Sequence, residues 1–515
     1  MKSRTLTCIT VIFAFATLAL SAQLTAQSKP SLKGGTAHHR YRFVDLNTLG
    51  GPNAGISCCG ILPPILNNRG TAVGSADTSV SNPNFTIENP ILVPCCPPAP
   101  DPFINVAVAW HGRIPENLGA LPGGYNSFGN AITANGTIVG NSETGDIDPL
   151  LGVVEVHPTL WTHGEIIDMG SFGGGEGAGS EANNHGQVVG FAQNSTSDPF
   201  GYFGFGTQTR AFLWEKRVLR DLGTLGTGND ASAIFINDRG QIAGVSYTNT
   251  TANPITQLPT QDPFFWDKGT MLDLGTLGGN YGVPAALNIH GQVAGNSDLA
   301  GNMTEQAFLW SRESGMKDLG TLGGTFSQAD DLTDAGDVVG ASTLPGDEIF
   351  LAVLWRDGAT TALPPLPGDC YSSAHAINSK GQIVGDSWDC NFLTRPFLWD
   401  KGELIDLRKY VPPASDMILS EPSSINDRGE IFGYGFLSNG DVHSFLLIPC
   451  DQNQQEGCED GTASAGSARA QNDPAMTMSN VTPKDVVSVL RDRFNRRHRN
   501  LPVPREARVF APKSE

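Results

Sequence analysis

Several motifs that mark catalysis or metal binding are absent from this sequence. It has no H-x-x-x-H or H-E-x-x-H pair and no G-x-S-x-G segment, and its 10 histidines are dispersed. These absences exclude the motif-defined zinc peptidases and the serine hydrolases that use a nucleophile elbow. A catalytic group assembled by the fold from distant serine, histidine and carboxylate residues stays open.

Positive charge is also scarce. Lys and Arg number 33 against 52 Asp and Glu, which gives a formal net charge of −19. The basic residues gather at the two ends, so the part between 41 and 450 is more acidic than the whole chain. An acidic surface repels nucleic acid and anionic membranes, and it also keeps an exported protein soluble. We therefore expect no nucleic-acid partner.

Long apolar runs are missing except at the N-terminus. The stretch from Leu6 to Ala22 is apolar or small throughout, follows two basic residues and precedes small residues that offer cleavage points. It is short of the ~20 residues that a spanning helix needs. The pattern indicates a secretory signal peptide over 1–26, with an uncleaved anchor as the alternative, and 27–40 is a linker. We expect a secreted protein, extracellular or periplasmic, without a transmembrane segment in the mature chain.

Cysteine usage agrees with export, because the number of cysteines outside the signal segment is even. Adjacent cysteines do not have the C-x₂₋₄-C spacing of a zinc site, which favours disulfides over metal. Two pairs are close enough in sequence to be natural partners, Cys370 with Cys390 and Cys450 with Cys458. The vicinal cysteines are expected to bridge to each other, with their connectivity open: Cys58, Cys59, Cys95 and Cys96.

Turn residues are plentiful, with 61 glycines and 34 prolines, and they recur in a repeat. The segment INDRGQIAG at 236–244 has eight copies, the first at 66–74 and the last at 425–433. The intervals settle near 45 residues, the length of a four-stranded propeller blade. We expect positive φ at the turn glycine of each copy. These glycines are Gly70, Gly136, Gly186, Gly240, Gly291, Gly336, Gly381 and Gly429.

Two further elements accompany each copy, a short apolar run that ends in Trp in seven copies and a segment related to DLGTLGG. Each unit is therefore predicted to contain four short strands, a to d, with tight a–b and c–d turns. The Asp of DLG is expected to accept backbone hydrogen bonds at the strand end. Repetition indicates packing between blades rather than ligand stacking for Trp110, Trp161, Trp214, Trp266, Trp310, Trp355 and Trp399.

The ends of the array predict a closed ring. Tyr41 to Leu46 is a d-type segment without its own a, b and c strands, whereas the last copy supplies a, b and c through Ile448 and then stops. A ring joins these partial units into one blade and removes exposed sheet edges. We predict an all-β protein, a β-propeller over 41–450 with eight blades of four short antiparallel strands, closed by the N-terminal strand pairing with the last repeat. An open solenoid and a seven-bladed ring are the alternatives.

The recurring DLGTLGG, INxxGQIVG and AFLW segments resemble the bacterial extracellular repeat family named HAF, after its His-Ala-Phe motif. The resemblance covers about residues 41–448, and it implies β-propeller-like repeats and bacterial export but little defined function. This chain departs from the name-giving motif, since only His157 and His443 occupy the His position. A repeated imidazole site is therefore not implied.

The region after Cys450 differs from the repeats. Residues 451–480 are rich in Gln, Ser, Ala, Gly and Asn, which is typical of a flexible linker. Residues 481–515 form a basic C-terminal tail with the pattern of a short amphipathic helix. Such a helix binds an anionic surface, folds back on the acidic repeats or has no role, and the sequence does not separate these alternatives.

The insertions break the symmetry of the repeats. Long b–c loops occur in the first four copies, at 76–105, 143–156, 192–209 and 247–262, and rigid scaffolds commonly carry recognition on such loops. The third contains aromatic residues between glycines. These rings are suited to stacking on sugars or on an apolar partner, or else they pack on neighbouring insertions: Phe200, Tyr202, Phe203 and Phe205.

Binding is the leading functional prediction. We expect a binding or scaffolding module for a polysaccharide, a cell-envelope component or a protein. The alternatives are a propeller enzyme acting on glycans with carboxylates near the central channel, and a purely structural surface protein. No cofactor is expected, because DLGTLGG precedes a strand rather than the helix of a phosphate loop. The acidic segments lack the Gly and Glu positions of a calcium loop, so a bound calcium ion stays open without a designated site.

Overall fold

The computed structural model describes residues 40–55, 65–84, 102–254, 256–450 and 458. Several predictions fall outside these residues: the signal peptide, nearly all of the linker 27–40, the tail 481–515, the linker 451–480 apart from Cys458, and the disulfides of Cys58, Cys59, Cys95 and Cys96. In the described part of the chain, no helix is long and apolar enough to cross a membrane.

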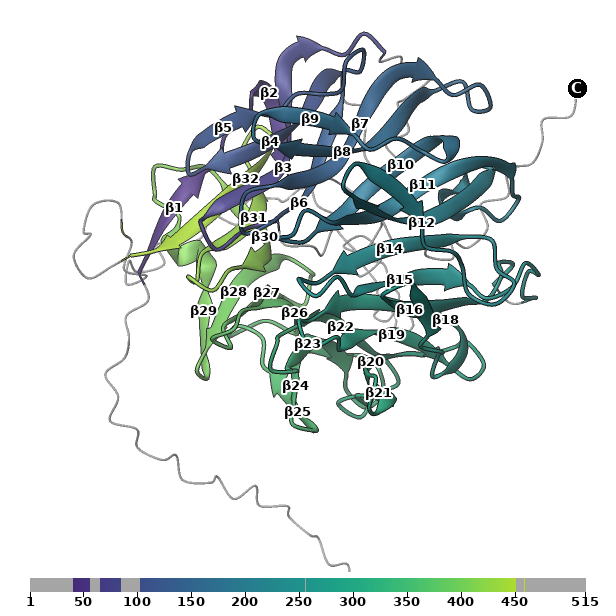
Figure 1. Cartoon of the computed structure of the whole chain (residues 1–515). Coiled ribbons are helices and arrows are strands. Elements are labelled where there is room, and N and C mark those ends of the chain that lie inside the picture. Colours follow the sequence, from purple (N-terminus) through teal and green to yellow (C-terminus); the bar gives the residue numbers. More distant parts are fainter. Residues whose placement is uncertain (1–39, 56–64, 85–101, 255, 451–457, 459–515) are drawn as a thin grey trace, which may run out of the picture. The chain divides into compact units, whose positions relative to one another are not determined.

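The described residues form 32 strands and two short 3₁₀ segments, η1 (Tyr202–Gly204) and η2 (Leu407–Tyr410), so the all-β prediction is confirmed (Figure 1). The strands form successive four-stranded antiparallel units, which we number 1 to 8. Units 1 to 4 are β2 (Gly50–Gly55), β3 (Thr71–Ser81), β4 (Phe103–His111), β5 (Ile114–Asn117); β6 (Ser127–Ile132), β7 (Ile138–Ile147), β8 (Val154–Thr162), β9 (Glu165–Asp168); β10 (Gly173–Ala182), β11 (Val188–Ser197), β12 (Thr207–Glu215), β13 (Val218–Asp221); and β14 (Ala231–Ile236), β15 (Ile242–Tyr247), β16 (Gln261–Asp267), β17 (Thr270–Asp273).

The remaining units follow the same plan, with the strands of each unit in the order a, b, c, d. Units 5 to 8 are β18 (Gly278–Leu287), β19 (Val293–Leu299), β20 (Glu305–Ser311), β21 (Gly315–Asp318); β22 (Ser327–Leu332), β23 (Val338–Thr343), β24 (Phe350–Arg356), β25 (Ala359–Leu363); β26 (Tyr371–Ile377), β27 (Ile383–Trp388), β28 (Thr394–Asp400), β29 (Glu403–Asp406); and β30 (Ile418–Ile425), β31 (Ile431–Phe436), β32 (Val442–Pro449) with β1 (Tyr41–Asp45). Units 2 and 3, and units 4 and 5, are each joined into an eight-stranded sheet by one parallel residue pair.

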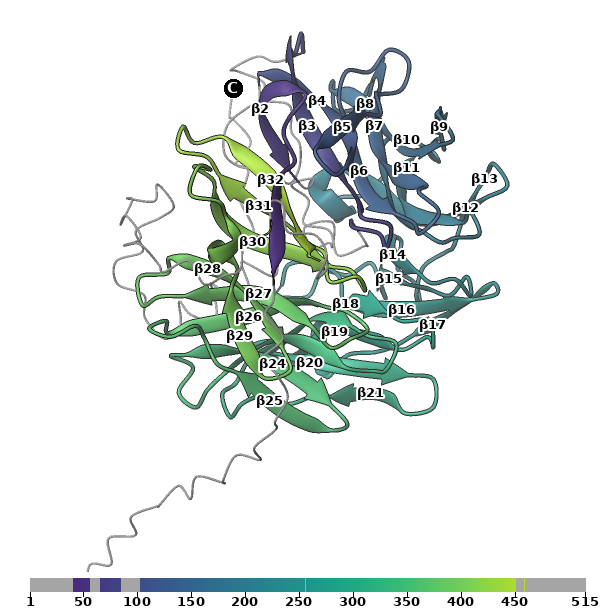
Figure 2. The ribbon, with the colours of Figure 1, turned by 90° about the vertical axis from the view of Figure 1, so that its left-hand side faces the viewer.

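The first and last strands pair with each other. β1 lies antiparallel to β32, with Tyr41 opposite Pro449 and Asp45 opposite Phe445. In Figures 1 and 2 the purple N-terminal strands accordingly lie beside the yellow-green β32. The predicted pairing of the N-terminal strand with the last repeat is thus confirmed, and β1 serves as the d strand of unit 8.

The glycine that ends the QIVG pattern is required by close packing within each unit. A Cβ atom placed on Gly244 would lie 2.2 Å from the carbonyl oxygen of Ser232 and 2.7 Å from the Phe264 ring. The carbonyl belongs to strand a, where a bulge shifts the register, and the ring belongs to strand c. The Gly of strand b and the Phe of the AFLW pattern are therefore two parts of one packing arrangement.

The repeated tryptophans lie between units. Trp310 of unit 5 is in a buried cluster with Phe265 of unit 4, and the two ring centroids are 5.1 Å apart. Trp161, Trp214, Trp266 and Trp355 belong in the same way to clusters that contain residues of the preceding unit. Trp399 is half-buried. The other six repeated tryptophans are buried: Trp110, Trp161, Trp214, Trp266, Trp310 and Trp355.

The a–b turns explain the INxxGQ pattern. The Asn237 side-chain oxygen accepts hydrogen bonds from the backbone N–H groups of Arg239 and Gln241, while its amide donates to the Gln241 side-chain oxygen at 2.8 Å. Positive φ between +73° and +94° occurs at all eight turn glycines named above. The Asn therefore closes the turn, and the following Gln orients it.

The same Asn side chain reaches the next unit. Asn237 Nδ2 donates to the backbone oxygen of Asn288, 2.9 Å away, and Asn288 Nδ2 donates to that of Thr333 at 3.1 Å. Equivalent bonds run from Asn67, Asn183, Asn378 and Asn426 to units 2, 4, 8 and 1 respectively. Where Thr133 and Thr333 replace Asn, the shorter side chain bonds within its own turn instead.

Candidate functional site

The two ends of each unit differ. The a–b and c–d turns form the turn end, whereas the b–c loops and the links between units form the insertion end. Because asparagine side chains join the a–b turns of neighbouring units, the b–c loops of those units emerge together at the opposite end. We therefore expect a recognition surface, if the chain has one, to lie at the insertion end.

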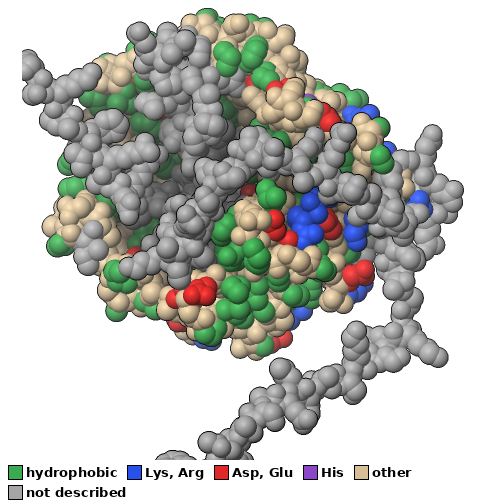
Figure 3. Space-filling model, turned by 180° about the vertical axis from the view of Figure 1, so that it is seen from behind, with side chains coloured by type: hydrophobic (Ala, Val, Ile, Leu, Met, Phe, Trp, Pro, Cys, Tyr) green, Lys and Arg blue, Asp and Glu red, His purple; other side chains and the backbone are tan. Residues whose placement is uncertain are grey.

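Exposed large hydrophobic side chains gather at the insertion end. Among the described residues, nine of the thirteen lie there: Val80, Tyr125, Ile147, Leu150, Leu151, Met303, Ile349, Leu393 and Ile418. The other four lie on strand d: Ile114, Ile166, Val218 and Leu272. Figure 3 shows one face of the molecule, where hydrophobic side chains alternate with small groups of acidic and basic ones. Exposed apolar groups at one end of a scaffold indicate a contact surface.

The predicted b–c loops are only partly loops. In unit 2 the pairing of β7 with β8 continues to Ile147 opposite Val154, and in unit 3 that of β11 with β12 continues to Ser197 opposite Thr207. Unit 1 extends to Ser81 opposite Phe103. The loop assignment is corrected here, because extending the ladder satisfies backbone groups that an irregular loop would leave unpaired.

An Asx-Pro pair begins the tip of each of the first three hairpins. Asp148 Oδ1 accepts hydrogen bonds from the backbone N–H groups of Leu150 and Leu151, at 2.7 and 2.9 Å. The side-chain oxygens of Asp198 and Asn82 accept from the residue two positions further on in the same way. The Asn-Pro and Asp-Pro pairs are visible in the sequence, and they are the turn signal that could have placed these hairpin tips.

The aromatic loop, residues 197–207, is the third of these tips. Tyr202 is 2 % exposed, and its ring lies 4.4 Å from that of Tyr247 in the core between units 4 and 5. Of the two alternatives for these rings, Tyr202 therefore follows the one in which they pack on a neighbouring insertion, and it anchors the loop. Phe200, Phe203 and Phe205 are half-buried. Phe203 stacks on Phe191, with centroids 4.5 Å apart, and packs against the core cluster that contains Tyr202.

Two carboxyl groups lie beneath this loop. Asp230 is 0 % exposed and Asp198 is 2 % exposed. Asp230 accepts hydrogen bonds from the backbone N–H groups of Tyr202 and Thr209, and Asp198 accepts one from that of Phe200. Burial and the neighbouring Asp198 raise the pKa of Asp230 to about 7, against the lowering effect of the backbone hydrogen bond from Thr209.

Buried polar atoms without hydrogen-bond partners surround the pair. They include Asn229 Oδ1, Tyr202 Oη and Thr209 Oγ1 among the described residues. Burial and nearby Tyr247 and Asp230 also raise the pKa of Tyr202 well above its usual value. Unsatisfied buried groups cost stability.

The geometry of the pair differs from that of a glycosidase. Glycoside hydrolysis requires two carboxyl groups ~5–9.5 Å apart, with room for sugar or water between them. Asp198 and Asp230 are instead both buried, and the aromatic loop donates backbone hydrogen bonds to Asp230. The pair does not support the alternative of a glycan-cleaving enzyme.

Two acidic side chains of β10, in unit 3, have raised pKa values. Burial, followed by Asp148, raises the pKa of Glu176 to about 8. Burial raises the pKa of Glu181 to about 8 as well, although that carboxylate accepts a hydrogen bond from the backbone N–H of Ile236 in unit 4. Among the described residues no group of three or more His, Cys, Asp or Glu is arranged to hold a metal ion.

Two histidines on strand c bond the Asp of DLG. His157 Nδ1 lies 3.0 Å from Asp168, and His443 Nδ1 lies 2.9 Å from Asp45 across the β1–β32 pair. Burial acts to raise the pKa of Asp168, but hydrogen bonds from His157 and the backbone of Gly170 hold it below its usual value. The DLG side chains also accept a backbone hydrogen bond two residues further on, as predicted, in seven units: Asp45, Asn117, Asp168, Asp221, Asp273, Asp318 and Asp406.

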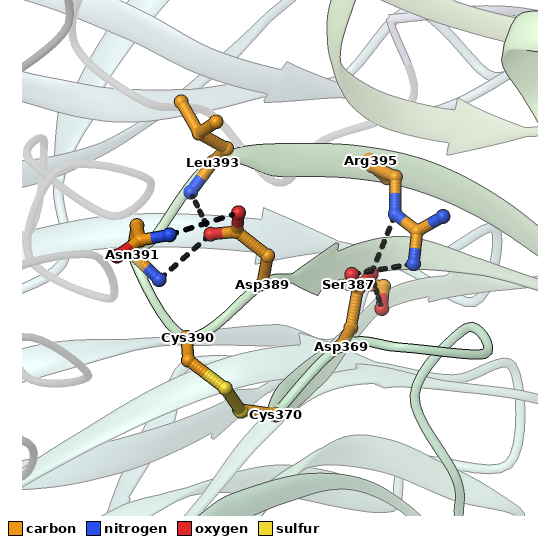
Figure 4. Close-up of a disulfide and its surroundings, with 8 residues drawn as sticks. All are labelled: Asp369, Cys370, Ser387, Asp389, Cys390, Asn391, Leu393 and Arg395. Atoms are coloured by element: carbon orange, nitrogen blue, oxygen red, sulfur yellow. Dashed lines mark hydrogen bonds and ion pairs between the residues drawn. A yellow bond between two sulfur atoms is a disulfide. The ribbon is translucent and has the colours of Figure 1, made fainter. Parts of the chain in front are cut away.

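Two predicted disulfides are present. Cys450 bonds Cys458, and Cys370 bonds Cys390 next to the unit 7 b–c loop. Figure 4 shows that loop, in which Asp389 accepts hydrogen bonds from the backbone N–H groups of Asn391 and Leu393, and the adjacent ion pair between Arg395 and Asp369. The disulfide ties the start of strand a to this loop, which fixes a further part of the insertion end.

Comparisons with known proteins identify no family. No family model matches the sequence, and no curated protein matches it. A puromycin-hydrolyzing peptidase from Mycobacterium tuberculosis is 13 % identical, with a TM-score of 0.37 over 63 % of this chain and 52 % of that chain. Pyrococcus horikoshii acylaminoacyl peptidase is 13 % identical, with a TM-score of 0.35 over 65 % of this chain and 53 % of that chain. TolB from Acinetobacter baumannii is 12 % identical, with a TM-score of 0.29 over 63 % of this chain and 82 % of that chain. This chain spans about half the length of the two peptidases, and at these scores the similarities carry no argument about its function.

Proposed function

We propose that the chain is an exported β-propeller of HAF-type repeats, with eight blades in a closed ring. The pairing of β1 with β32 and the hydrogen bond from Asn426 of unit 8 to Asn67 of unit 1 support closure. The two disulfides are compatible with an oxidising compartment. A closed ring gives a rigid scaffold on which the insertion end stays fixed.

The function we propose for this scaffold is binding. The partner is a glycan, a cell-envelope component or a protein, and it contacts the insertion end of units 2 and 3. The observation that carries the proposal is the unit 2 tip, where Ile147, Leu150 and Leu151 are 58 %, 62 % and 36 % exposed. Asp148 holds that tip in place through its side-chain hydrogen bonds. Pre-organised apolar groups bind with little loss of conformational entropy.

The test changes Ile147, Leu150 and Leu151 together to Ser. These side chains face solvent, so melting should stay near wild type while binding is lost. The matched control is Ile114→Ser with Val218→Ser, at 71 % and 58 % exposure on the turn end. Binding is measured on a glycan array, on purified envelope fractions, and by titration with each captured protein after purification. Equal binding by both variants would refute the proposal.

A further inference from the structure

We propose that the insertion end recognises a basic side chain: a lysine or arginine of a partner protein inserts beside the unit 2 tip and pairs with Glu176. This inference rests on the proposed function, because it names the class of partner for the same surface. Among a glycan, an envelope component and a protein, it selects a protein segment that presents one positive charge next to apolar residues.

Four carboxyl groups lie together where units 2 and 3 meet. Glu176 lies on β10 of unit 3, which one parallel residue pair joins to β8 of unit 2. Its charged neighbours all belong to unit 2, and they are Asp148, Glu155 and Glu143. Gly175 permits their approach, because a Cβ atom at that position would collide with Asp148 Oδ2. The unit 2 hairpin thus brings its acidic residues against the first strand of unit 3.

Glu176 lacks the donor that its equivalents in neighbouring units have. Counted from the bulge of strand a, the same position holds Asn126 in unit 2 and Asp230 in unit 4. Asn126 Oδ1 accepts a hydrogen bond from the backbone N–H of Asn105 at 3.0 Å, and Asp230 Oδ1 accepts from that of Thr209 at 2.7 Å. Glu176 is 8 % exposed, and no described residue donates a hydrogen bond to it. This nearly buried acceptor is available to a donor from outside the chain.

Positive charge is missing from this part of the insertion end. No lysine or arginine occurs in the insertions of units 1 to 4, at 76–105, 143–156, 192–209 and 247–262. Among the described residues, no lysine or arginine forms an ion pair with the four carboxyl groups. His157 Nε2 lies 3.9 Å from Glu155 Oε2, but His157 Nδ1 is bonded to Asp168. The cluster therefore has room for a compensating charge that this surface does not supply.

Asp148 connects the carboxyl cluster to the apolar tip. Its Oδ1 accepts the backbone hydrogen bonds of the two exposed leucines of the tip, and Glu176 lies beside the same side chain. Glu155, with a side chain 23 % exposed, opens the cluster to solvent. Since the described residues offer no metal-binding group, a long side chain that ends in an ammonium or guanidinium group fits better than a bare ion. A polypeptide carries such a group and apolar neighbours together.

Glu176 must be ionised to pair with the cation. Burial, followed by Asp148, raises the pKa of Glu176 to about 8, as expected for a carboxyl group without a positive neighbour. A bound lysine or arginine favours the ionised form and donates charge-assisted hydrogen bonds to it, which are stronger than neutral ones. Binding is therefore measured above pH 8, where no proton competes.

The experiment titrates the full chain with two acetylated peptide amides, Gly-Leu-Arg-Leu-Gly and the same peptide with Gln in place of Arg, at pH 8.5. Physiological ionic strength screens long-range attraction to an acidic chain. The wild-type chain should bind the Arg peptide about tenfold more tightly or better. Glu176→Gln should remove this preference, because the amide keeps the shape and loses the charge. Glu155→Gln, at a partly exposed position, should reduce it, and Glu165→Gln, exposed on β9, should leave it unchanged.

Equal binding of the two peptides by the wild-type chain would overturn the inference, as would a preference for Arg that persists in Glu176→Gln. Tighter binding of a chitosan oligosaccharide or of Ca²⁺ alone, lost in Glu176→Gln, would also overturn it and assign the cluster to an amino sugar or a metal. The triple Ser variant of the tip tests the proposed function separately. Loss of partner binding in that variant would support the proposed function even without a peptide preference. A preference that depends on Glu176 would show cation recognition even if that variant kept its partner.

Discussion

Asn426 donates a hydrogen bond from its side-chain amide to the backbone oxygen of Asn67, 2.9 Å away and 359 residues earlier in the chain. The same bond joins four other successive pairs of units and leads from Asn67 to unit 2. One residue of the repeat thus closes its own turn and also connects that turn to the next. The last copy makes this contact with the first.

Removing this contact should weaken the junction of the two chain ends. We expect Asn426→Ala to lower the free energy of unfolding by about 1–3 kcal/mol, because the amide is buried and its partners are left unsatisfied. Denaturant titration measures the effect. Asn439→Ala is the control, since that exposed side chain bonds only Asp441 and should change little. Equal stability of the two variants would show that the junction does not depend on this bond.

The repeated tryptophans should matter for stability and not for binding. Trp310→Ala should cost about 3–5 kcal/mol, because it removes a buried ring packed on Phe265 and leaves a cavity between units. Binding at the insertion end should persist at temperatures where the variant stays folded. A variant with normal melting and no binding would assign Trp310 to the recognition surface instead.

Stability should be highest in mildly acidic solution. Burial raises the folded-state pKa of Glu176 and Glu181 to about 8 and those of Asp230 and Asp262 to about 7, far above the ~4 of an unfolded chain. The folded state therefore binds more protons between about pH 4 and 8, and its stability falls as pH rises through that window. Melting followed from pH 4 to 9 should show this decline.

A single substitution tests the contribution of Glu181 to this pH dependence. Glu181→Gln keeps an oxygen that can accept the hydrogen bond from Ile236 but cannot ionise, so it should flatten the decline between about pH 5 and 8. Glu165→Gln, at an exposed position, should leave the profile unchanged. A melting temperature that rises from pH 5 to 8 would contradict the assignment of these raised pKa values.

Prediction from sequence succeeded where every copy of the repeat imposes the same local requirement. The turn glycines, the Asp of DLG and the four strands of a unit depend on contacts within about one unit, and each is repeated often enough to stand out. The insertions occur once each. Their hairpin extensions depend on pairing between strands such as β7 and β8, which periodicity does not report.

Tyr202 shows what the sequence alone could not decide. A tyrosine between glycines has the same local pattern whether its ring faces solvent or the core, and only the position of Tyr247, 45 residues later, makes it an anchor. Asp230 joins units 3 and 4 in the same way, because it precedes the first strand of unit 4 and accepts backbone hydrogen bonds from Tyr202 and Thr209 of unit 3. The sequence by itself determined the repeating strands, their turns and the order of the units, because these follow from local conformation and period. The tertiary structure decided which insertion residues are buried, since burial depends on packing between neighbouring units.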